Sequence, residues 1–299
     1  MPWPYLHYDV FTREPFLGNQ LAVFTDARGL EDARMQRMAR EMNFSESTFI
    51  LPAEQPDTDI RMRIFTPHSE LPIAGHPTIG STFALAKTGV IARGAPRFVF
   101  GLNVGPTPVD LEWSGADLTF VWMTMPPPVF GPIVDGRADV AAALGLEAHD
   151  LVPELPVQQV TCGVPYLLVP LRDHATVDRA VSDAAAFRRL AVSSGLDIPI
   201  FLFAIGGPSS ETVYSRMFAP ELGIIEDPAT GSASGPLGCY LVRHGVVRGR
   251  AAQTIVSRQG VAMGRASSIH VSIGGDASAI SEVKVGGEAV LAGRGELVV

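Results

Sequence analysis

Four side chains in three separate stretches of the sequence could move a proton or bind an anion. Glu46 follows Ser45 at the entrance to an apolar segment, where partial burial would raise the pKa of its carboxyl and allow proton exchange near neutrality. His76 stands at the start of an apolar, glycine-bounded segment. Asp227 precedes a second such segment and Ser232 begins it. An imidazole and two carboxylates are groups that general acid–base catalysis uses.

Each of these residues also has a purely structural interpretation. Taken alone, Glu46 reads more readily as a capping or surface carboxylate, and His76 suits a helix start as well as it suits acid–base work. Asp227 and Ser232, taken alone, are better N-terminal caps than catalysts. Their joint placement at two matched helix starts is what favours chemistry.

The two segments are copies of one pattern. GHPTIGSTFALAKTG, residues 75–89, superposes on GSASGPLGCYLVRHG, residues 231–245, at a constant shift that places His76 on Ser232. Pro236 must fall in the first helical turn, because deeper in the helix it would remove a backbone hydrogen bond. The many small residues suit a helix that runs close to other backbone. We predict a buried central helix in each segment, the second beginning near Ser232.

Two further landmarks repeat in the same order. RIFTP at residues 63–67 matches RMFAP at residues 216–220, ahead of the helices, and GNQLAVF at residues 18–24 is a fainter echo of GVPYLLV at residues 163–169. Chance similarity of glycine-bounded apolar runs explains one such pair more readily than three in order. A repeat of this length indicates two similar lobes rather than a solenoid.

Short strand-like segments surround the central helices, which predicts an α+β fold. Residues 30–42 and 176–194 have the pattern of outer helices and residues 140–144 that of a short one. Residues 43–51 leave the first outer helix through polar residues and enter an apolar strand. The other expected strands are residues 5–10, 21–25, 60–65, 98–104, 109–113, 118–123, 158–170, 200–205, 212–218, 254–257, 269–273, 282–285, 289–292 and 297–299. The Met-Pro-Pro-Pro stretch at residues 125–128 marks a boundary and predicts an N-terminal lobe of residues 1–125, completed by about residues 283–299, and a C-terminal lobe of residues 126–282.

The composition excludes several kinds of partner. The net charge of −8, without clustered Lys and Arg, argues against nucleic acid. No apolar run reaches membrane-spanning length, and the first ten residues lack the pattern of a secretory leader, so we expect no membrane partner and a cytoplasmic protein. Seven histidines without paired ligand spacing predict no metal site.

The two helix starts suggest where a ligand binds. If the lobes are related by a pseudo-twofold axis, the helix N-termini can face one another across a cleft, each with unpaired N–H groups and about half a positive charge. Such a cleft attracts a carboxylate. Gly75 and Gly231 would let the backbone approach the ligand closely. We therefore expect a small carboxylate-bearing substrate.

Four longer stretches together resemble one family. RIFTPHSELPIAGHPT, NFSES, VFTREPFLGNQLAVF and EDPATGSASGPLGCYL are similar to the PhzF-type phenazine biosynthesis proteins, relatives of the diaminopimelate epimerase fold. The resemblance covers nearly the whole chain, and the joint occurrence of GHPT and DPATGSA is its most specific part. It implies two pseudo-symmetric lobes, each a curled, mostly antiparallel, barrel-like sheet around a central helix, and a homodimer.

The resemblance also implies an activity, the cofactor-free isomerisation of trans-2,3-dihydro-3-hydroxyanthranilate. Glu46 would take a proton from one ring carbon and return it to another, while the other site residues bind and orient the substrate and its carboxylate. Ser47 stands where threonine is expected in the family, which leaves Glu46 in place. The implied site comprises the catalytic residues Glu46, His76 and Asp227 and the substrate-binding residues Ser45, Gly75, Gly231 and Ser232.

The two cysteines argue against racemisation by two thiols. An epimerase of this fold needs one thiol at each helix start, whereas Cys239 lies seven residues beyond Ser232, roughly 10 Å along the helix axis. Cys162 echoes a pre-glycine position of a strand. We interpret both as small core residues.

Three functions stay open from the sequence. The first is a PhzF-type isomerase, the second a non-catalytic protein that binds small anions, and the third an isomerase or epimerase of an unrelated metabolite. The sequence does not specify the substrate. We expect specificity residues in loops near residues 57–61, 103–107 and 258–265.

Overall fold

The computed structural model describes residues 2–196, 199–206 and 212–298. The chain divides into two compact units, unit 1 with Met1–Thr124 and Val285–Val299, and unit 2 with Met125–Lys284. The sequence placed the boundary between residues 125 and 126 and the return at about residue 283. No helix in the described ranges is long and apolar enough to cross a membrane.

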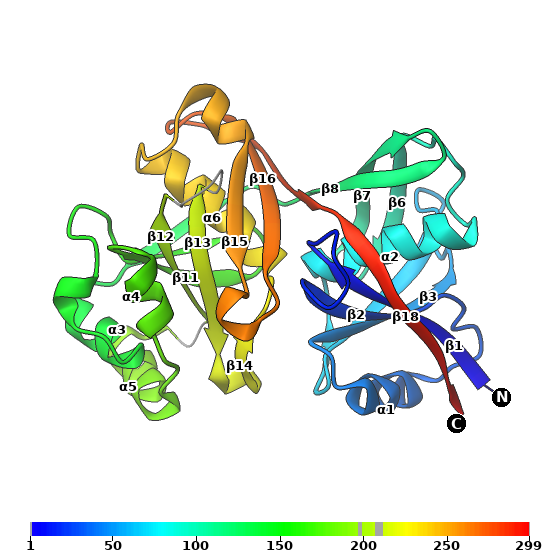
Figure 1. The fold of residues 1–299 in the computed structure, drawn as a ribbon, viewed down its shortest axis with the longest axis horizontal. Helices are drawn as coiled ribbons and strands as arrows, with labels where there is room; N and C mark the ends of the chain where they lie inside the picture. Colours follow the sequence, from blue (N-terminus) through cyan, green and yellow to red (C-terminus); the bar gives the residue numbers. More distant parts are fainter. Residues whose placement is uncertain (1, 197–198, 207–211, 299) are drawn as a thin grey trace. The chain divides into compact units, whose positions relative to one another are not determined.

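Unit 1 consists of a curled sheet, one outer helix and one central helix (Figure 1). Its elements are β1 (Pro2–Val10), β2 (Asn19–Phe24), α1 (Asp32–Met42), β3 (Glu46–Pro52), β4 (Ile60–Phe65), β5 (Glu70–Leu71), α2 (Gly75–Thr88), β6 (Arg97–Leu102), β7 (Gly105–Ser114), β8 (Asp117–Thr124) and β18 (Ala289–Val298).

The central helix α2 confirms the first predicted helix start. It contacts β1, β2, β3, β8 and β18, and all its residues from Gly75 to Leu85 are buried. Its small residues allow this, because a Cβ at Gly80 would stand 2.6 Å from side-chain atoms of Leu21 and Val10. Gly89, with φ 80°, follows its last turn in the left-handed conformation that ends many helices.

Unit 2 has its own sheet and central helix, with further helices outside the sheet (Figure 1). Its elements are β9 (Val129–Ile133), α3 (Arg137–Ala143), η1 (Ala148–Asp150), β10 (Gln158–Thr161), β11 (Pro165–Leu171), α4 (His174–Arg179), α5 (Ala184–Ser194), β12 (Ile200–Ile205), β13 (Val213–Ala219), η2 (Pro220–Leu222), β14 (Ile224–Asp227), α6 (Gly231–Arg243), η3 (Gly249–Gln253), β15 (Ile255–Gln259), η4 (Val261–Met263) and β16 (Ser267–Gly275). The strand β17 (Ile280–Gly287) leads from unit 2 back into unit 1.

The central helix α6 is buried from Ala233 to Val242 and contacts β10, β11 and β16. The prediction that Pro236 lies in the first turn is wrong, because α6 begins at Gly231 and the proline is its sixth residue. The ring removes the helical hydrogen bond to the carbonyl of Ser232. Dense packing of the same segment compensates for the lost hydrogen bond. The packing is so close that a Cβ at Gly238 would stand 2.6 Å from a side-chain atom of Val271.

Two other predicted elements are divided in the structure. The single outer helix predicted at residues 176–194 is the pair α4 and α5, because Asp183 accepts hydrogen bonds from the amides of Ala185 and Ala186 and so starts a new helix. The strand predicted at residues 158–170 is the hairpin β10–β11, which turns at Gly163 with φ 117°.

At the C-terminus the two predicted strands are one. Residues 289–292 and 297–298 belong to the continuous strand β18, which pairs with β1 along its length. Residue 299 of the second predicted strand lies outside the described residues.

The two units repeat one order of strand pairing. The directions are antiparallel, parallel, antiparallel, antiparallel, parallel and antiparallel for β1–β2, β2–β3, β3–β4, β4–β5, β4–β6 and β6–β7. They are the same for β10–β11, β11–β12, β12–β13, β13–β14, β13–β15 and β15–β16. A mixed α+β fold of two matching units, each with a mostly antiparallel sheet around one central helix, confirms the predicted fold class.

Candidate active site

Two of the predicted residues meet in unit 1. Glu46 is the first residue of β3 and His76 the second residue of α2, and Glu46 Oε2 lies 3.4 Å from His76 Nε2. Their side chains are 13% and 5% exposed. The carboxylate is thus mostly shielded from water at an edge of the core.

The strand register explains why these side chains meet. Glu46 pairs with Leu21 on β2, and the next residue, Ser47, pairs with Phe65 on β4, so the beginning of β3 is fixed from both sides. The chain then runs through β4 and β5 to α2, which packs against β2 and β3. Packing of α2 on these strands brings His76 to the carboxylate.

His76 is a neutral imidazole at physiological pH. Burial lowers its pKa to about 3, and a hydrogen bond with the backbone of Gln20 acts in the opposite direction. Its Nδ1 lies 3.4 Å from Nδ2 of Asn19. A neutral ring can donate one hydrogen bond and accept another, which suits orienting or relaying a proton beside Glu46.

Asp227 lies at the end of β14 in unit 2, where it pairs with Met217 on β13 and is 6% exposed. The hydroxyl of Thr230 donates to its Oδ2 at 2.5 Å. The amide of Gln259, which is fully buried, donates to the backbone carbonyl of Asp227 at 2.8 Å. The aspartate is therefore held at both its side chain and its backbone.

Ser232 lies in the first turn of α6 and is partly exposed. Its Oγ lies 2.7 Å from the hydroxyl of Tyr166 on β11. Gly231 is the first residue of α6, as Gly75 is of α2, and both are buried. Ser45 lies directly before β3 and is partly exposed.

Sequence reasoning missed three side chains that hold the site residues. They are Asn19 beside His76, Tyr166 beside Ser232 and Gln259 beside Asp227. Asn19 and Tyr166 fall within the repeated strand landmarks, which offered a signal. Gln259 falls within the stretch expected to carry specificity near residues 258–265, but no local pattern indicated its partners, which lie about thirty residues earlier in the chain.

The strand registers also show which residues the copies share. Ser47 pairs with Phe65 in unit 1 and Ile200 pairs with Phe218 in unit 2, so the counterpart of Glu46 is Pro199. The helix superposition likewise places His76 on Ser232 and Leu71 on Asp227. The side chains of the predicted site therefore differ between the two copies.

A bidentate ion pair, in contrast, occurs in both copies. Arg63 donates to Glu70 at 2.8 and 2.7 Å, and Arg216 donates to Glu226 at 2.8 Å through both nitrogens. Each guanidinium also lies over a phenylalanine ring two residues further along its strand, at 5.1 and 4.8 Å from the ring centroid. Each pair ties together the two strands that lead into a central helix.

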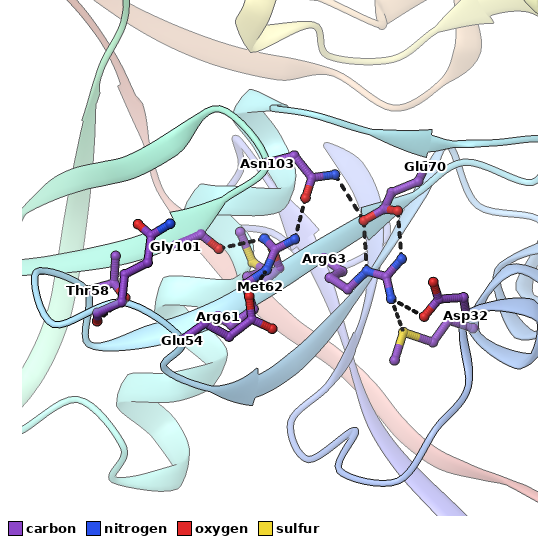
Figure 2. A network of polar contacts seen from close by, with 11 residues as sticks. Asp32, Glu54, Thr58, Arg61, Met62, Arg63, Glu70, Gly101 and Asn103 are labelled. Atoms are coloured by element: carbon purple, nitrogen blue, oxygen red, sulfur yellow. Dashed lines mark hydrogen bonds and ion pairs between the residues drawn. The ribbon is translucent and has the colours of Figure 1, made fainter.

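In unit 1 this pair belongs to a longer network (Figure 2). Asn103 donates to Glu70 at 3.1 Å and accepts from Arg61, whose guanidinium also donates to the carbonyl of Gly101 at 2.8 Å. The network borders a hollow of about 190 Å³. Two of the stretches expected to carry specificity, residues 57–61 and 103–107, therefore meet in unit 1.

The two cysteines lie together in the core of unit 2. Cys162 and Cys239 are buried free thiols with their Sγ atoms 3.9 Å apart. The neighbouring thiol of Cys162, and then burial, raise the pKa of Cys239. Within the described ranges, no group of three His, Cys, Asp or Glu side chains is arranged to hold a metal ion.

The family model of the phenazine biosynthesis-like proteins (PhzC-PhzF) matches residues 8–295. Because this match covers nearly the whole chain, the protein belongs to this family. The two duplicated α+β units and the Glu–His pair at a central helix start are features of this member. The trans-2,3-dihydro-3-hydroxyanthranilate isomerase of Pseudomonas aeruginosa is 37% identical over 284 residues, 95% of each chain. The uncharacterized isomerase YddE of Escherichia coli is 34% identical over 288 residues, also 95% of each chain.

Solved structures agree with this assignment. The Bacillus anthracis phenazine biosynthesis protein of the PhzF family superposes with a TM-score of 0.89 at 26% identity over all of both chains. The structure of a probable proline racemase from Agrobacterium radiobacter superposes with a TM-score of 0.66 at 14% identity, over 99% of this chain and 93% of that one, and shares the fold alone. These matches confirm the predicted family and the prediction that the chain is an isomerase.

Proposed function

We propose that this protein is a cofactor-independent isomerase that moves a proton on a small, carboxylate-bearing, dihydro-hydroxyanthranilate-like substrate. The observation that carries the proposal is the Glu46–His76 pair: a carboxylate mostly shielded from water stands 3.4 Å from a neutral imidazole. The isomerases among the relatives support the reaction class.

Glu46 is the acid–base group of this proposal. Its carboxylate takes a proton from one substrate carbon, the electron pair of that C–H bond shifts the double bonds, and the resulting carboxylic acid returns the proton to another carbon. No atom is gained or lost, so the net change is an isomerisation. His76 stays neutral and orients the carboxyl and the substrate.

The remaining predicted residues bind and orient the substrate. Gly75 and Gly231 begin helices whose first backbone N–H groups have no helical partner, and such groups favour a carboxylate. The hydroxyl of Ser232 adds a donor, and Ser45 lies beside the base. Asp227 is an acceptor for a polar hydrogen of the substrate.

Turnover of trans-2,3-dihydro-3-hydroxyanthranilate tests the proposal. We expect its ultraviolet spectrum to change with time when the protein is added, without any added cofactor. Binding of this compound without any reaction would favour the non-catalytic anion-binding protein. Exchange of carbon-bound hydrogen in another carboxylate compound, and not in this one, would favour an isomerase of another metabolite.

The homodimer and the cytoplasmic location stay predictions. A chain of 31.8 kDa should sediment as a species of about twice that mass if the dimer forms. Sedimentation as a monomer at micromolar concentration would contradict it.

A further inference from the structure

Gln259, the last residue of β15, holds the turn between Asp227 and Thr230 through three hydrogen bonds. Its Nε2 donates to the carbonyl of Asp227 at 2.8 Å and to the hydroxyl of Thr230 at 3.0 Å, and its Oε1 accepts from the amide of Thr230 at 3.0 Å. The side chain is fully buried. A single amide thus fixes both ends of the turn that carries Asp227.

The direction of each bond follows from the donors. A backbone N–H can only donate, so the group that faces the amide of Thr230 must be the carbonyl oxygen of Gln259. Both hydrogens of Nε2 are then used on Asp227 and Thr230. Because the Thr230 hydroxyl accepts one of them, its own hydrogen points to Asp227 Oδ2, 2.5 Å away. The chain of bonds ends on the carboxylate that the proposed function uses.

Two further residues lie against the same turn, Gly260 directly after β15 and Ser267 at the start of β16. Ser267 donates to the carbonyl of Pro228 at 3.1 Å. Gly260 has φ 74°, and a Cβ there would stand 2.5 Å from the same carbonyl oxygen. Gln259 and Gly260 fall within the stretch near residues 258–265 that was expected to influence specificity.

The first copy of the repeat has no such arrangement. Arg61 pairs with Gly101 in unit 1 as Tyr214 pairs with Arg258 in unit 2, so the counterpart of Gln259 is Leu102. Residues 71 and 74, the counterparts of Asp227 and Thr230, are leucine and alanine. The fold therefore forms with apolar residues at all three positions.

Burying three polar groups costs free energy that apolar residues do not require. The Arg–Glu pairs, which occur in both copies, serve the architecture that the copies share. The Asp227–Thr230–Gln259 trio occurs in one copy only, which indicates a task other than building the unit.

We propose that Gln259 and Thr230 are positioning residues that fix the carboxylate of Asp227 in the orientation needed to act on the substrate. The role of Asp227 rests on the proposed function. The fixation of Asp227 by Gln259 and Thr230 rests on the observed hydrogen bonds alone.

The test compares kcat and KM of the full chain in four variants with trans-2,3-dihydro-3-hydroxyanthranilate as the probe. We expect Gln259→Met and Thr230→Val each to lower kcat by about tenfold or more with KM changed less than about threefold, since positioning acts on the transition state. Thr230→Ser keeps the hydroxyl and should stay within about threefold of the unchanged protein. Gln158→Met, which removes a buried amide bound to Gly131 and His244, is the matched control and should keep its kcat.

Hydrogen–deuterium exchange tests the fixation of the Asp227 turn independently of the reaction. The amides of residues 227 and 229–231 should exchange faster in Gln259→Met than in Gln158→Met, because the Thr230 amide loses its acceptor. Unchanged exchange there, or a kcat of Thr230→Val as high as that of Thr230→Ser, would overturn the proposal. If the unchanged protein does not turn over the probe, the proposed function fails. The exchange result still decides whether Gln259 fixes the Asp227 turn.

Discussion

The imidazole Nε2 of His76 lies 3.4 Å from the carboxylate Oε2 of Glu46, and burial lowers the pKa of the imidazole to about 3. A histidine beside a carboxylate is usually expected to be protonated. Here burial outweighs the opposing hydrogen bond with the backbone of Gln20, so the ring beside the carboxyl group of Glu46 is neutral.

The buried His76 should make stability fall in acid. Between pH 6.5 and 3 the unfolded chain binds a proton on this ring and the folded protein does not, so lowering the pH favours unfolding by up to about 1.4 kcal/mol per pH unit. His76→Gln removes this proton uptake. From urea unfolding at pH 6.5 and pH 4.5, we expect the unchanged protein to lose about 2 kcal/mol more than the variant.

His149→Gln is the control for that measurement, because His149 is exposed. It should keep the pH dependence of the unchanged protein. Parallel pH dependences for the unchanged protein and His76→Gln would contradict a buried neutral ring.

Tyr166→Phe should weaken substrate binding. The variant removes the hydroxyl that lies 2.7 Å from Ser232 and leaves the ring in place. Loss of one such hydrogen bond is worth about 1 kcal/mol, so we expect KM to rise about fivefold with kcat nearly unchanged. Tyr214→Phe removes a hydroxyl that donates to Asp178 elsewhere in unit 2 and should leave KM as it was. Equal KM values for the two variants would remove Ser232 from the binding account.

Breaking the ion pair ahead of α6 should destabilise the fold more than breaking a surface pair. The side chains of Arg216 and Glu226 are 10% and 13% exposed. Glu226→Gln leaves the guanidinium without its charged partner and should cost about 3 kcal/mol in unfolding experiments. Asp26→Asn breaks the exposed pair with Arg28 and should leave the unfolding midpoint unchanged. Similar midpoints for both variants would show that the repeated pair contributes little.

The parts of the fold that the sequence predicted are those with local signals. Glycine, proline and small residues mark the two central helices, and the constant shift between them reveals the duplication. The sequence singled out Glu46 and His76 because each residue lies at the start of a predicted element, but it did not predict their contact. The family motifs then supplied the roles that spacing alone left undecided between catalysis and capping.

The parts that were missed depend on side chains distant in sequence. Nothing in the pattern near Gln259 shows that its amide binds Asp227, and Asp183 gave no clear sign that it would start α5. Pro236 was expected in the first turn because deeper in the helix it would cost a backbone hydrogen bond, whereas the tertiary packing of α6 outweighs that loss. The predicted meeting of the two helix starts concerns the placement of the units, and it stays a prediction.

The most direct test of the account replaces Glu46 with glutamine, which keeps the size and removes the base. Both proteins are incubated in deuterated water with trans-2,3-dihydro-3-hydroxyanthranilate, and carbon-bound deuterium is measured by mass spectrometry and NMR. We expect the unchanged protein to form product and the Glu46→Gln variant to bind the substrate while its turnover falls by about a thousandfold or more. Product formation and carbon-bound exchange at undiminished rates in the variant would contradict the central role of Glu46.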